Sequence, residues 1–489
     1  MVSIAALQLI TRLLTPADWE RFDYYAAKIK VLDLCVPIHC RDPFKNKGHH
    51  YLFGRRPTPL LFPQLRILTW SSTSDTHLAP LLVGEQLERL SVTFIPLAPG
   101  HHNRSPEDLH AVFGPLPQLK RLHFYINRPH VVPLLAWNDL HSSDKLNVLH
   151  VNMRLHPDDM VRLALLPSLQ ELHFVVESGE DLVPLLAVRD QPIFPSLHTL
   201  SLSNSRQHSG ASVRSCTALL QKIRPGVLQD VGLEVLGPSS SLVRDQFLSA
   251  LCNHSSTLHK MRLVDVRIGH TQSLPMDDVF RDHDMISLLP LTNLTHLQLS
   301  FVCQYDLGDA MLLQMAASWP ALESLRISHR TDVGWRQRSR VTFHGLAGLV
   351  KLCPYLCELT LAMDISRIGP EHGELVGNRY VATIDLLDSA IVTQDDEDVL
   401  ANAARCFATL FPKLEEIFSS NPLWQLRAGE QWRAFLDAVE ACWAAIVNRI
   451  RVLDPTRRHI ASLHDNRGDP RPGAFVQPHM VCGLGLHYN

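Results

Sequence analysis

The sequence has no apolar run long enough to span a bilayer. Its first apolar stretch, Val2 to Ile10, has no basic residue before it, so it also lacks the layout of a secretory signal. Ten cysteines are scattered along a chain without an export signal, which is typical of reduced thiols in the cytosol or nucleus. We therefore expect a cytoplasmic or nuclear protein.

The sequence also lacks an excess of one charge and the common catalytic motifs. Its formal charge is −3, so the whole chain carries no electrostatic attraction for nucleic acid or an anionic membrane. It contains no Gly-rich phosphate loop, no Gly-x-Ser-x-Gly elbow and no His-Glu-x-x-His helix. We expect neither enzymatic activity nor a cofactor, and no nucleic-acid or membrane partner.

What the sequence does contain is one short phrase written many times. It reads FPQLRILTW at 62–70, LPQLKRLHF at 116–124, LPSLQELHF at 166–174, FPSLHTLSL at 194–202 and WPALESLRI at 319–327. In the shorthand L-x-x-L-x-L, successive units start 22 to 36 residues apart, and the units at 228, 381 and 414 fit the pattern loosely. The fourteen starts are Ile29, Leu65, Leu87, Leu119, Leu146, Leu169, Leu197, Leu228, Leu258, Leu294, Leu322, Leu356, Val381 and Leu414.

The spacing within each unit predicts a strand, and the segments between units predict helices. The last two apolar positions are two residues apart, which is the alternation of a strand with one buried face. Residues 242–254, 310–319 and 395–411 have apolar residues at helical spacing, and 105–113 begins with a Ser-Pro helix start. Strand, loop and helix repeating in this way predict an α/β leucine-rich-repeat solenoid: a curved parallel sheet with helices on the convex face.

The predicted organisation has four parts. Residues 1–28 form N-terminal capping helices, with Thr15 as N-cap and Pro16 as the first helical residue. Residues 29–420 form the repeat array, with an insertion at 41–60. Residues 421–453 form a C-terminal capping helix with an apolar stripe that includes Trp443, and 454–489 form a disordered tail.

Residues 14–34, LTPADWERFDYYAAKIKVLDL, and 61–70, LFPQLRILTW, resemble the region just after the F-box in basidiomycete F-box proteins. The resemblance covers roughly residues 14 to 450 and is strongest over the first 70. It implies the target-recognition part of an SCF ubiquitin ligase subunit, in which the F-box grips a Skp adaptor and the repeats hold the target.

The sequence departs from that family at its start. Only 28 residues precede Ile29, and no Leu-Pro-opened helical segment among them matches an F-box. We expect that the chain is truncated there, so that Skp adaptor and cullin bind only if an F-box lies upstream. The alternative is a free-standing repeat protein that sequesters or inhibits a partner independently of ubiquitin.

In a leucine-rich strand, the variable positions that flank the second and third apolar residues face the concave side of the solenoid. Three histidines occupy the middle variable position in consecutive units, about 4.8 Å apart in a regular sheet. A partner with a mixed-charge surface would suit this face. The candidate partner-binding residues are Arg89, Arg121, His123, His150, Glu171, His173, Arg262, His296, Gln298 and Arg326.

Metal binding is the less favoured interpretation of two clusters. His123, His150 and His173 present imidazoles at one level, and Cys35, His39 and Cys40 are metal-ligand types without a second pair at finger-like spacing. The favoured interpretations are a polar concave surface and a reduced loop, respectively, so no metal site is predicted. The basic insertion at 41–57 is most simply a solvated loop, and Cys353 and Cys357 are most simply core or interface residues.

Overall fold

The computed structural model of the chain describes residues 15–34, 60–72, 79–94, 116–126, 134–135, 144–188, 192–204, 211–235, 241–265, 279–301, 304–329, 339–364, 375–387, 389, 397–418, 441, 443–450 and 452. The chain divides into two compact units. Unit 1 comprises 1–270 and 290–294, and unit 2 comprises 271–289 and 295–489.

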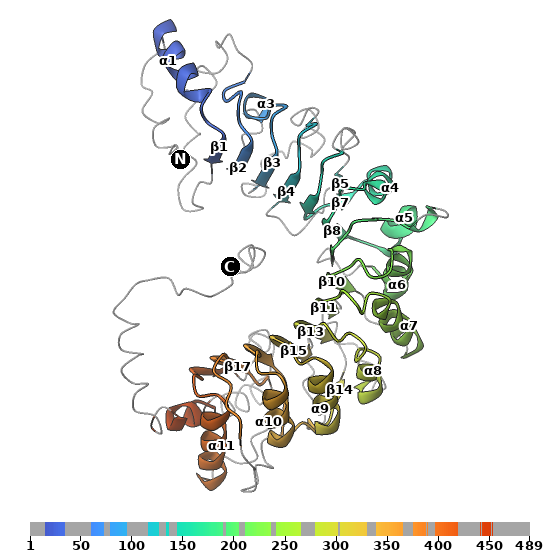
Figure 1. Cartoon of the computed structure of the whole chain (residues 1–489), viewed down its shortest axis with the longest axis vertical. Helices are drawn as coiled ribbons and strands as arrows, with labels where there is room; N and C mark the ends of the chain where they lie inside the picture. The colour runs from blue at the N-terminus through green and yellow to red at the C-terminus, as the bar shows by residue number, and fades with distance from the viewer. Residues whose placement is uncertain are drawn as a thin grey trace, which may run out of the picture. The chain divides into compact units, whose positions relative to one another are not determined.

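Unit 1 contains a parallel sheet with one strand from each repeat (Figure 1). The pairing runs from β1 through β2, β3, β4, β6, β8, β9 and β10 to β11, and every described pair is parallel. Its strands are β1 Val31–Leu34, β2 Ile67–Ser72, β3 Arg89–Phe94, β4 Arg121–Ile126, β6 Val148–Val151, β8 Glu171–Val176, β9 Thr199–Asn204, β10 Asp230–Val235 and β11 Lys260–Asp265, with the short pair β5 Leu134–Leu135 and β7 Arg154–Leu155. Its helices are α1 Pro16–Ala26, α3 Ala79–Leu82, α4 Pro157–Leu165, η5 Gly179–Leu182, α5 Val183–Ala187, α6 Val213–Lys222 and α7 Ser241–Cys252.

Unit 2 repeats the arrangement. Its parallel sheet runs from β13 through β15, β16 and β17 to β18, and a second short ladder pairs β12 with β14. The strands are β12 Val279–Arg281, β13 His296–Phe301, β14 Gln304–Asp306, β15 Ser324–His329, β16 Glu358–Thr360, β17 Thr383–Asp385 and β18 Glu416–Phe418. The helices are α8 Asp282–Ile286, α9 Asp309–Ser318, α10 Phe343–Leu352 and α11 Glu397–Leu410.

Helices join the strands and pack against one another on one side of each sheet. Helices α6 and α7 pack together in unit 1, and α9 and α10 do so in unit 2 (Figure 1). The three helices predicted at 242–254, 310–319 and 395–411 are α7, α9 and α11, whereas 105–113 lies outside the described residues. No described helix is long and apolar enough to cross a bilayer. The predicted α/β leucine-rich-repeat solenoid is confirmed in this strand and helix order.

The first helix begins as its capping residues predict. The side-chain oxygen of Thr15 accepts a hydrogen bond from the backbone N–H of Asp18, and the Asp18 carboxylate accepts one from the backbone N–H of Thr15. This reciprocal pair supplies acceptors to two backbone N–H groups that would otherwise lack a hydrogen-bond partner at the start of the helix. The ring of Phe22 then lies 5.9 Å from that of Phe62, which packs α1 against the first written-out repeat phrase.

The apolar positions of the phrase form the core of both units. The first apolar position of every unit from Leu65 to Leu414 is at most 3% exposed, including the loosely written ones at 228, 381 and 414. Burying a leucine side chain contributes roughly 1.5–3 kcal/mol. Repetition of the phrase therefore builds the core one layer at a time.

A repeated backbone contact fixes each strand against the next. In most of the described repeats, the carbonyl of the residue just after the first apolar position accepts two N–H groups from the following repeat. Glu88 accepts from Lys120 and Arg121 at 2.8 and 3.1 Å in unit 1, and Thr295 accepts from Glu323 and Ser324 at 2.7 and 3.0 Å in unit 2. Equivalent positions of neighbouring repeats are thereby held at the same level.

Two described segments belong to the predicted ends of the array. At the C-terminal side, residues 443–450 are helical and Trp443, 1% exposed, meets the ring of Phe407 edge-on at 5.9 Å. The predicted tail, 454–489, lies outside the described residues, as does most of the insertion at 41–60. The proposed part boundaries stay predictions.

Replacing a buried leucine of the phrase will test this layer-by-layer core. Leu172→Ala on β8, where Leu172 is 1% exposed, will lower the free energy of unfolding by about 2–5 kcal/mol because it leaves a cavity between layers. The matched control is Leu165→Ala on α4, where the leucine is 49% exposed and the change will stay within about 0.5 kcal/mol. Urea unfolding of the whole chain measures both, and equal effects would contradict the assignment.

Candidate functional site

The strand register brings the middle variable positions of neighbouring repeats to one level. In unit 1 the register pairs run without a shift from β1 to β11. We call the side of each sheet that carries these side chains the open face of that unit. In unit 1 its middle row consists of Asp33, Thr69, Ser91, His123, His150, His173, Ser201, Gly232 and Arg262, and in unit 2 of Gln298, Arg326, Thr360, Asp385 and Phe418.

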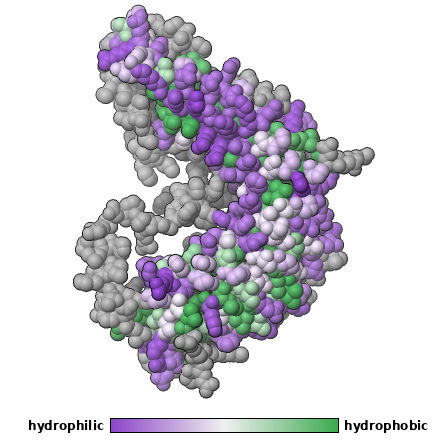
Figure 2. All heavy atoms as spheres, viewed as in Figure 1, coloured by the Kyte–Doolittle hydropathy of each residue, from purple (hydrophilic) through white to green (hydrophobic). Residues whose placement is uncertain are grey.

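The open face of unit 1 is mostly hydrophilic over its first strands. Its middle row begins with Asp33, Thr69, Ser91 and His123, which are all polar. On the side of the molecule that Figure 2 shows, hydrophilic residues predominate over β2 to β4. On β4 the burial alternates, so that Leu122 and Phe124 point into the core while Arg121 and His123 are exposed or half-buried. The same alternation, read from the sequence, predicted which side chains would be available to a partner.

The three histidines of the middle row stand next to one another. The ring centroids of His123 and His150 are 4.5 Å apart, and those of His150 and His173 are 5.9 Å apart. Their depth differs, because His150 is 7% exposed while the other two are half-buried. A ring nitrogen of His173 lies 3.0 Å from the hydroxyl of Ser203 on the next strand. The row is thus a partly covered imidazole stack with the central ring held inside it.

Glu171 contacts the central ring of this stack from within the protein. Its carboxylate lies 3.4 Å from Nε2 of His150. The hydrogen bond with His150 is the largest cause that lowers the pKa of Glu171 below its ordinary value of 4.5, and the nearby charges of Arg121 and His123 lower the pKa further against the effect of burial. Glu171 is therefore ionised and already engaged at neutral pH.

The histidine stack does not form a three-ligand metal set in the described part of the chain. The ligand atoms of three histidines would have to gather within 4.8 Å of one another, and those of His123, His150 and His173 do not. Adjacent strands hold the rings in a line, whereas a tetrahedral or octahedral site needs ligands that converge on one point. The geometry suits contact with a partner better than metal coordination.

The remaining predicted residues also lie on the open faces. On β11 the Arg262 guanidinium lies 3.3 Å from the Glu234 carboxylate. In unit 2, Arg326 on β15 lies 3.1 Å from the Glu358 carboxylate, and Gln298 is its register partner on β13. His296 is half-buried, with Nδ1 2.9 Å from the hydroxyl of Thr295. Whether these residues bind a partner stays a prediction.

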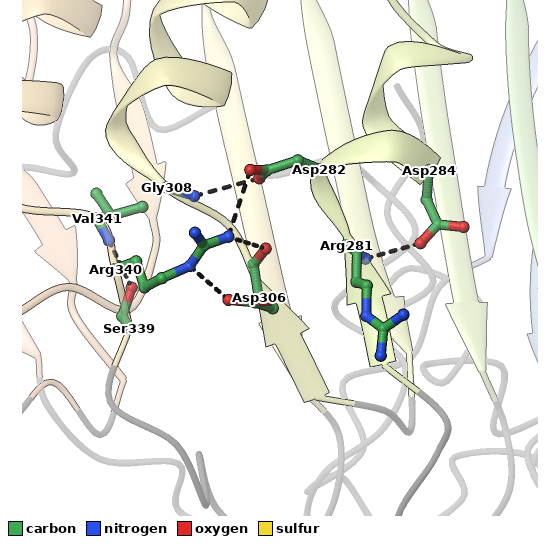
Figure 3. Close-up of polar contacts among 8 residues, drawn as sticks. All are labelled: Arg281, Asp282, Asp284, Asp306, Gly308, Ser339, Arg340 and Val341. Atoms are coloured by element: carbon green, nitrogen blue, oxygen red, sulfur yellow. Dashed lines mark hydrogen bonds and ion pairs between the residues drawn. The ribbon is translucent and has the colours of Figure 1, made fainter.

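Sequence reasoning missed the polar contacts that run between repeats. In unit 2, Arg340 joins two earlier repeats: its Nε lies 2.6 Å from Asp306 Oδ1 and its Nη2 3.3 Å from Asp282 Oδ2 (Figure 3). The second Asp282 oxygen accepts a hydrogen bond from the backbone N–H of Gly308. Asp306 and Asp282 lie 34 and 58 positions before Arg340 with no shared motif, so only the place of the three residues at or just before the starts of successive helices could have indicated the contact.

The structure describes two of the cysteines singled out from the sequence and leaves the Cys35, His39 and Cys40 cluster outside the described residues. Cys353 is buried, with its thiol 3.4 Å from the Trp319 carbonyl oxygen, and burial raises the pKa of that thiol to about 12. Cys357 is exposed at the start of β16.

Comparison with known proteins adds little to the assignment. No protein-family model matches this chain, and no curated protein matches it. A solved structure from Bacteroides fragilis is similar over 52% of this chain and 67% of its own, with 15% identity and a TM-score of 0.32. A leucine-rich-repeat protein from Leptospira interrogans is similar over 73% of this chain and 84% of its own, with 13% identity and a TM-score of 0.29. At these scores neither likeness supports a function, and the fold assignment stands on the strand pairing.

The Glu171–His150 contact gives a testable pH dependence. Because the folded-state pKa of Glu171 is below 4.5, the contact contributes stability above about pH 4.5 and loses it as the pH falls through the folded-state pKa. Replacing His150 by Gln will raise the pKa of Glu171 towards its ordinary value, measured by carboxyl-carbon NMR titration. His173→Gln, on the same strand as Glu171, is the control and will leave that pKa unchanged. A pKa of Glu171 at or above 4.5 in the unaltered protein would refute the contact.

Proposed function

We propose that the protein is a non-catalytic scaffold that binds another protein on the open faces of its repeat sheets. The observation that carries the proposal is the register-aligned row of polar and charged side chains on those faces. Helices occupy the other side of each sheet, so the strands offer the surface whose side chains vary most freely between repeats. A partner would be held by many side chains at fixed spacing.

The chemistry of the described cysteines supports a binding function over a catalytic one. A nucleophilic cysteine needs a lowered pKa, because the thiolate is the reactive form. Burial instead raises the pKa of every described cysteine thiol, to about 12 for Cys216 and Cys353. These thiols favour the unreactive protonated form.

The finer proposal is that this scaffold is the target-recognition part of an F-box-type SCF ubiquitin ligase subunit in the cytoplasm or nucleus. Its support is the resemblance at residues 14–34 and 61–70, which correspond to α1, β1 and the start of β2. In this mechanism the open face holds a target so that a ligase bound elsewhere on the protein can modify it. The Skp adaptor and cullin are partners only if the full protein carries an F-box. The alternative, sequestration or inhibition of a partner without ubiquitin, uses the same face.

A bulky residue on the open face will test the binding function. Ser201→Tyr on β9 places an aromatic ring beside Gly232, which has no side chain to fill that part of the face. It will reduce capture of the partner from an extract of the source organism at least tenfold, measured by quantitative mass spectrometry. Ser249→Tyr makes the same change at an exposed position of α7 and will leave capture unaltered. Equal capture by both variants would exclude this face as the binding surface.

The link to ubiquitin needs a separate binding assay. The full-length gene product is mixed with purified Skp adaptor, and complex formation is measured by size-exclusion chromatography. A stable complex supports the ligase subunit, whereas partner capture without adaptor binding favours the free-standing scaffold.

A further inference from the structure

Two neighbouring arginines on the open face of unit 1 differ from the other charged residues there. Arg89 on β3 and Arg121 on β4 are direct register partners, so their backbones lie about 4.8 Å apart on parallel strands. Both are exposed. Neither arginine side chain forms a hydrogen bond or an ion pair with another residue in the described part of the chain, although the charge of Arg89 lowers the pKa of Glu88 and that of Arg121 lowers the pKa of Glu171. The face thus presents two adjacent positive charges that repel each other.

The acids near this arginine pair are already engaged by other bases. Glu171 contacts His150, as described above. The two oxygens of the Glu88 carboxylate lie 3.4 Å from Arg66 and 2.9 Å from Lys120, one on each side. The hydrogen bond from Lys120 is the first cause that lowers the pKa of Glu88, so this carboxylate is ionised and held. The positive charge of the arginine pair is consequently not cancelled inside the protein.

An arginine at the other end of the same sheet does form an ion pair, and it serves as a comparison for Arg89 and Arg121. On β11, Arg262 is also exposed, but it lies 3.3 Å from the Glu234 carboxylate of the preceding strand. An arginine on this sheet therefore finds a carboxylate partner where the neighbouring repeat supplies one. Glu234 lies two residues after the register partner of Arg262 on the preceding strand. The equivalent residues for Arg89 and Arg121 are Thr69 and Ser91, and the register partners on the outer sides of the pair are Ile67 and Val148, so none of these positions supplies a carboxylate.

We propose that Arg89 and Arg121 form a docking site for an acidic peptide segment of the bound partner, with carboxylates two residues apart in an extended chain. This proposal rests on the binding function proposed above and names the chemistry of the segment bound. Arginine accepts a carboxylate through two parallel N–H donors, so each guanidinium binds one carboxylate. In an extended chain, side chains two residues apart lie on one face about 6.7 Å apart, a spacing that two flexible arginine arms on adjacent strands can match.

The neighbouring side chains favour a short peptide over a long polyanion. Thr69 and Ser91, which belong to the middle row, lie next to the two arginines. Their side chains are small and leave room for a peptide backbone that crosses the strands. A nucleic acid running along the face would meet the carboxylates of Glu88 and Glu171, whereas two carboxylates of an extended peptide reach the arginine pair alone. Half-buried His123, two residues after Arg121 on the same side of β4, adds a hydrogen-bonding ring beside the second carboxylate.

Fluorescence polarisation of the full chain with labelled peptides tests the proposal. The probe is an eight-residue peptide with alternating glutamate and serine, and its partner probe has glutamine in place of each glutamate. We expect the glutamate peptide to bind at least tenfold more tightly than the glutamine peptide, with an affinity that falls as salt rises. The double variant Arg89→Gln/Arg121→Gln will lose at least tenfold in affinity. The control Arg214→Gln/Arg224→Gln removes the same charge at exposed positions on α6 and just after it, and it will change affinity less than twofold.

Three results would overturn the proposal. The first is no preference for glutamate over glutamine, and the second is equal weakening by the test and control variants, which indicates non-specific attraction. The third is binding of a phosphoserine peptide with no binding of the glutamate peptide, because the site would then select phosphate. If the peptide fails while Ser201→Tyr still abolishes partner capture, the docking site is wrong and the binding function stands.

Discussion

The whole structure depends on one repeated lateral contact between neighbouring strands. In most of the described repeats, a carbonyl just after the first buried apolar residue accepts two backbone N–H groups from the next repeat, as Glu88 does from Lys120 and Arg121. The buried leucines hold the layers together, and this contact sets their level. A strand displaced by one residue would turn its apolar side chains outward, so the register and the core enforce each other.

Because the register is fixed, the position of a residue within its repeat determines which side chains lie next to it on the open face. Because equivalent positions lie side by side, a residue in one repeat is paired or unpaired according to what the adjacent repeat supplies. His150 lies beside Glu171, and Arg262 lies beside Glu234, so those polar groups have partners within the sheet. Arg89 and Arg121 face each other, and their charges stay available to a partner. The binding properties of the open face therefore follow from differences between successive repeats.

The sequence predicted the order of the strands and the level of each side chain in the sheet, because both follow directly from the regular spacing of the leucines. The histidine row, for example, follows from counting four residues on from each start. The sequence did not predict that His150 is buried while its neighbours are half-buried, since that depth depends on the packing of adjacent side chains. Nor did it predict the contacts of Arg340 with Asp282 and Asp306, because those residues share no motif and meet only after the repeats stack. The division into two units has no clear signal in the repeat spacing.

Pulsed dipolar EPR tests the register most directly. Spin labels on unnatural amino acids at Thr69 and Ser201, which occupy the middle row on β2 and β9, are separated by five strand spacings. The account predicts a single narrow distance of about 24 Å between their backbones, allowing for the label arms. A broad distribution, or a distance beyond about 35 Å, would show that these strands do not form one parallel ladder and would contradict the account.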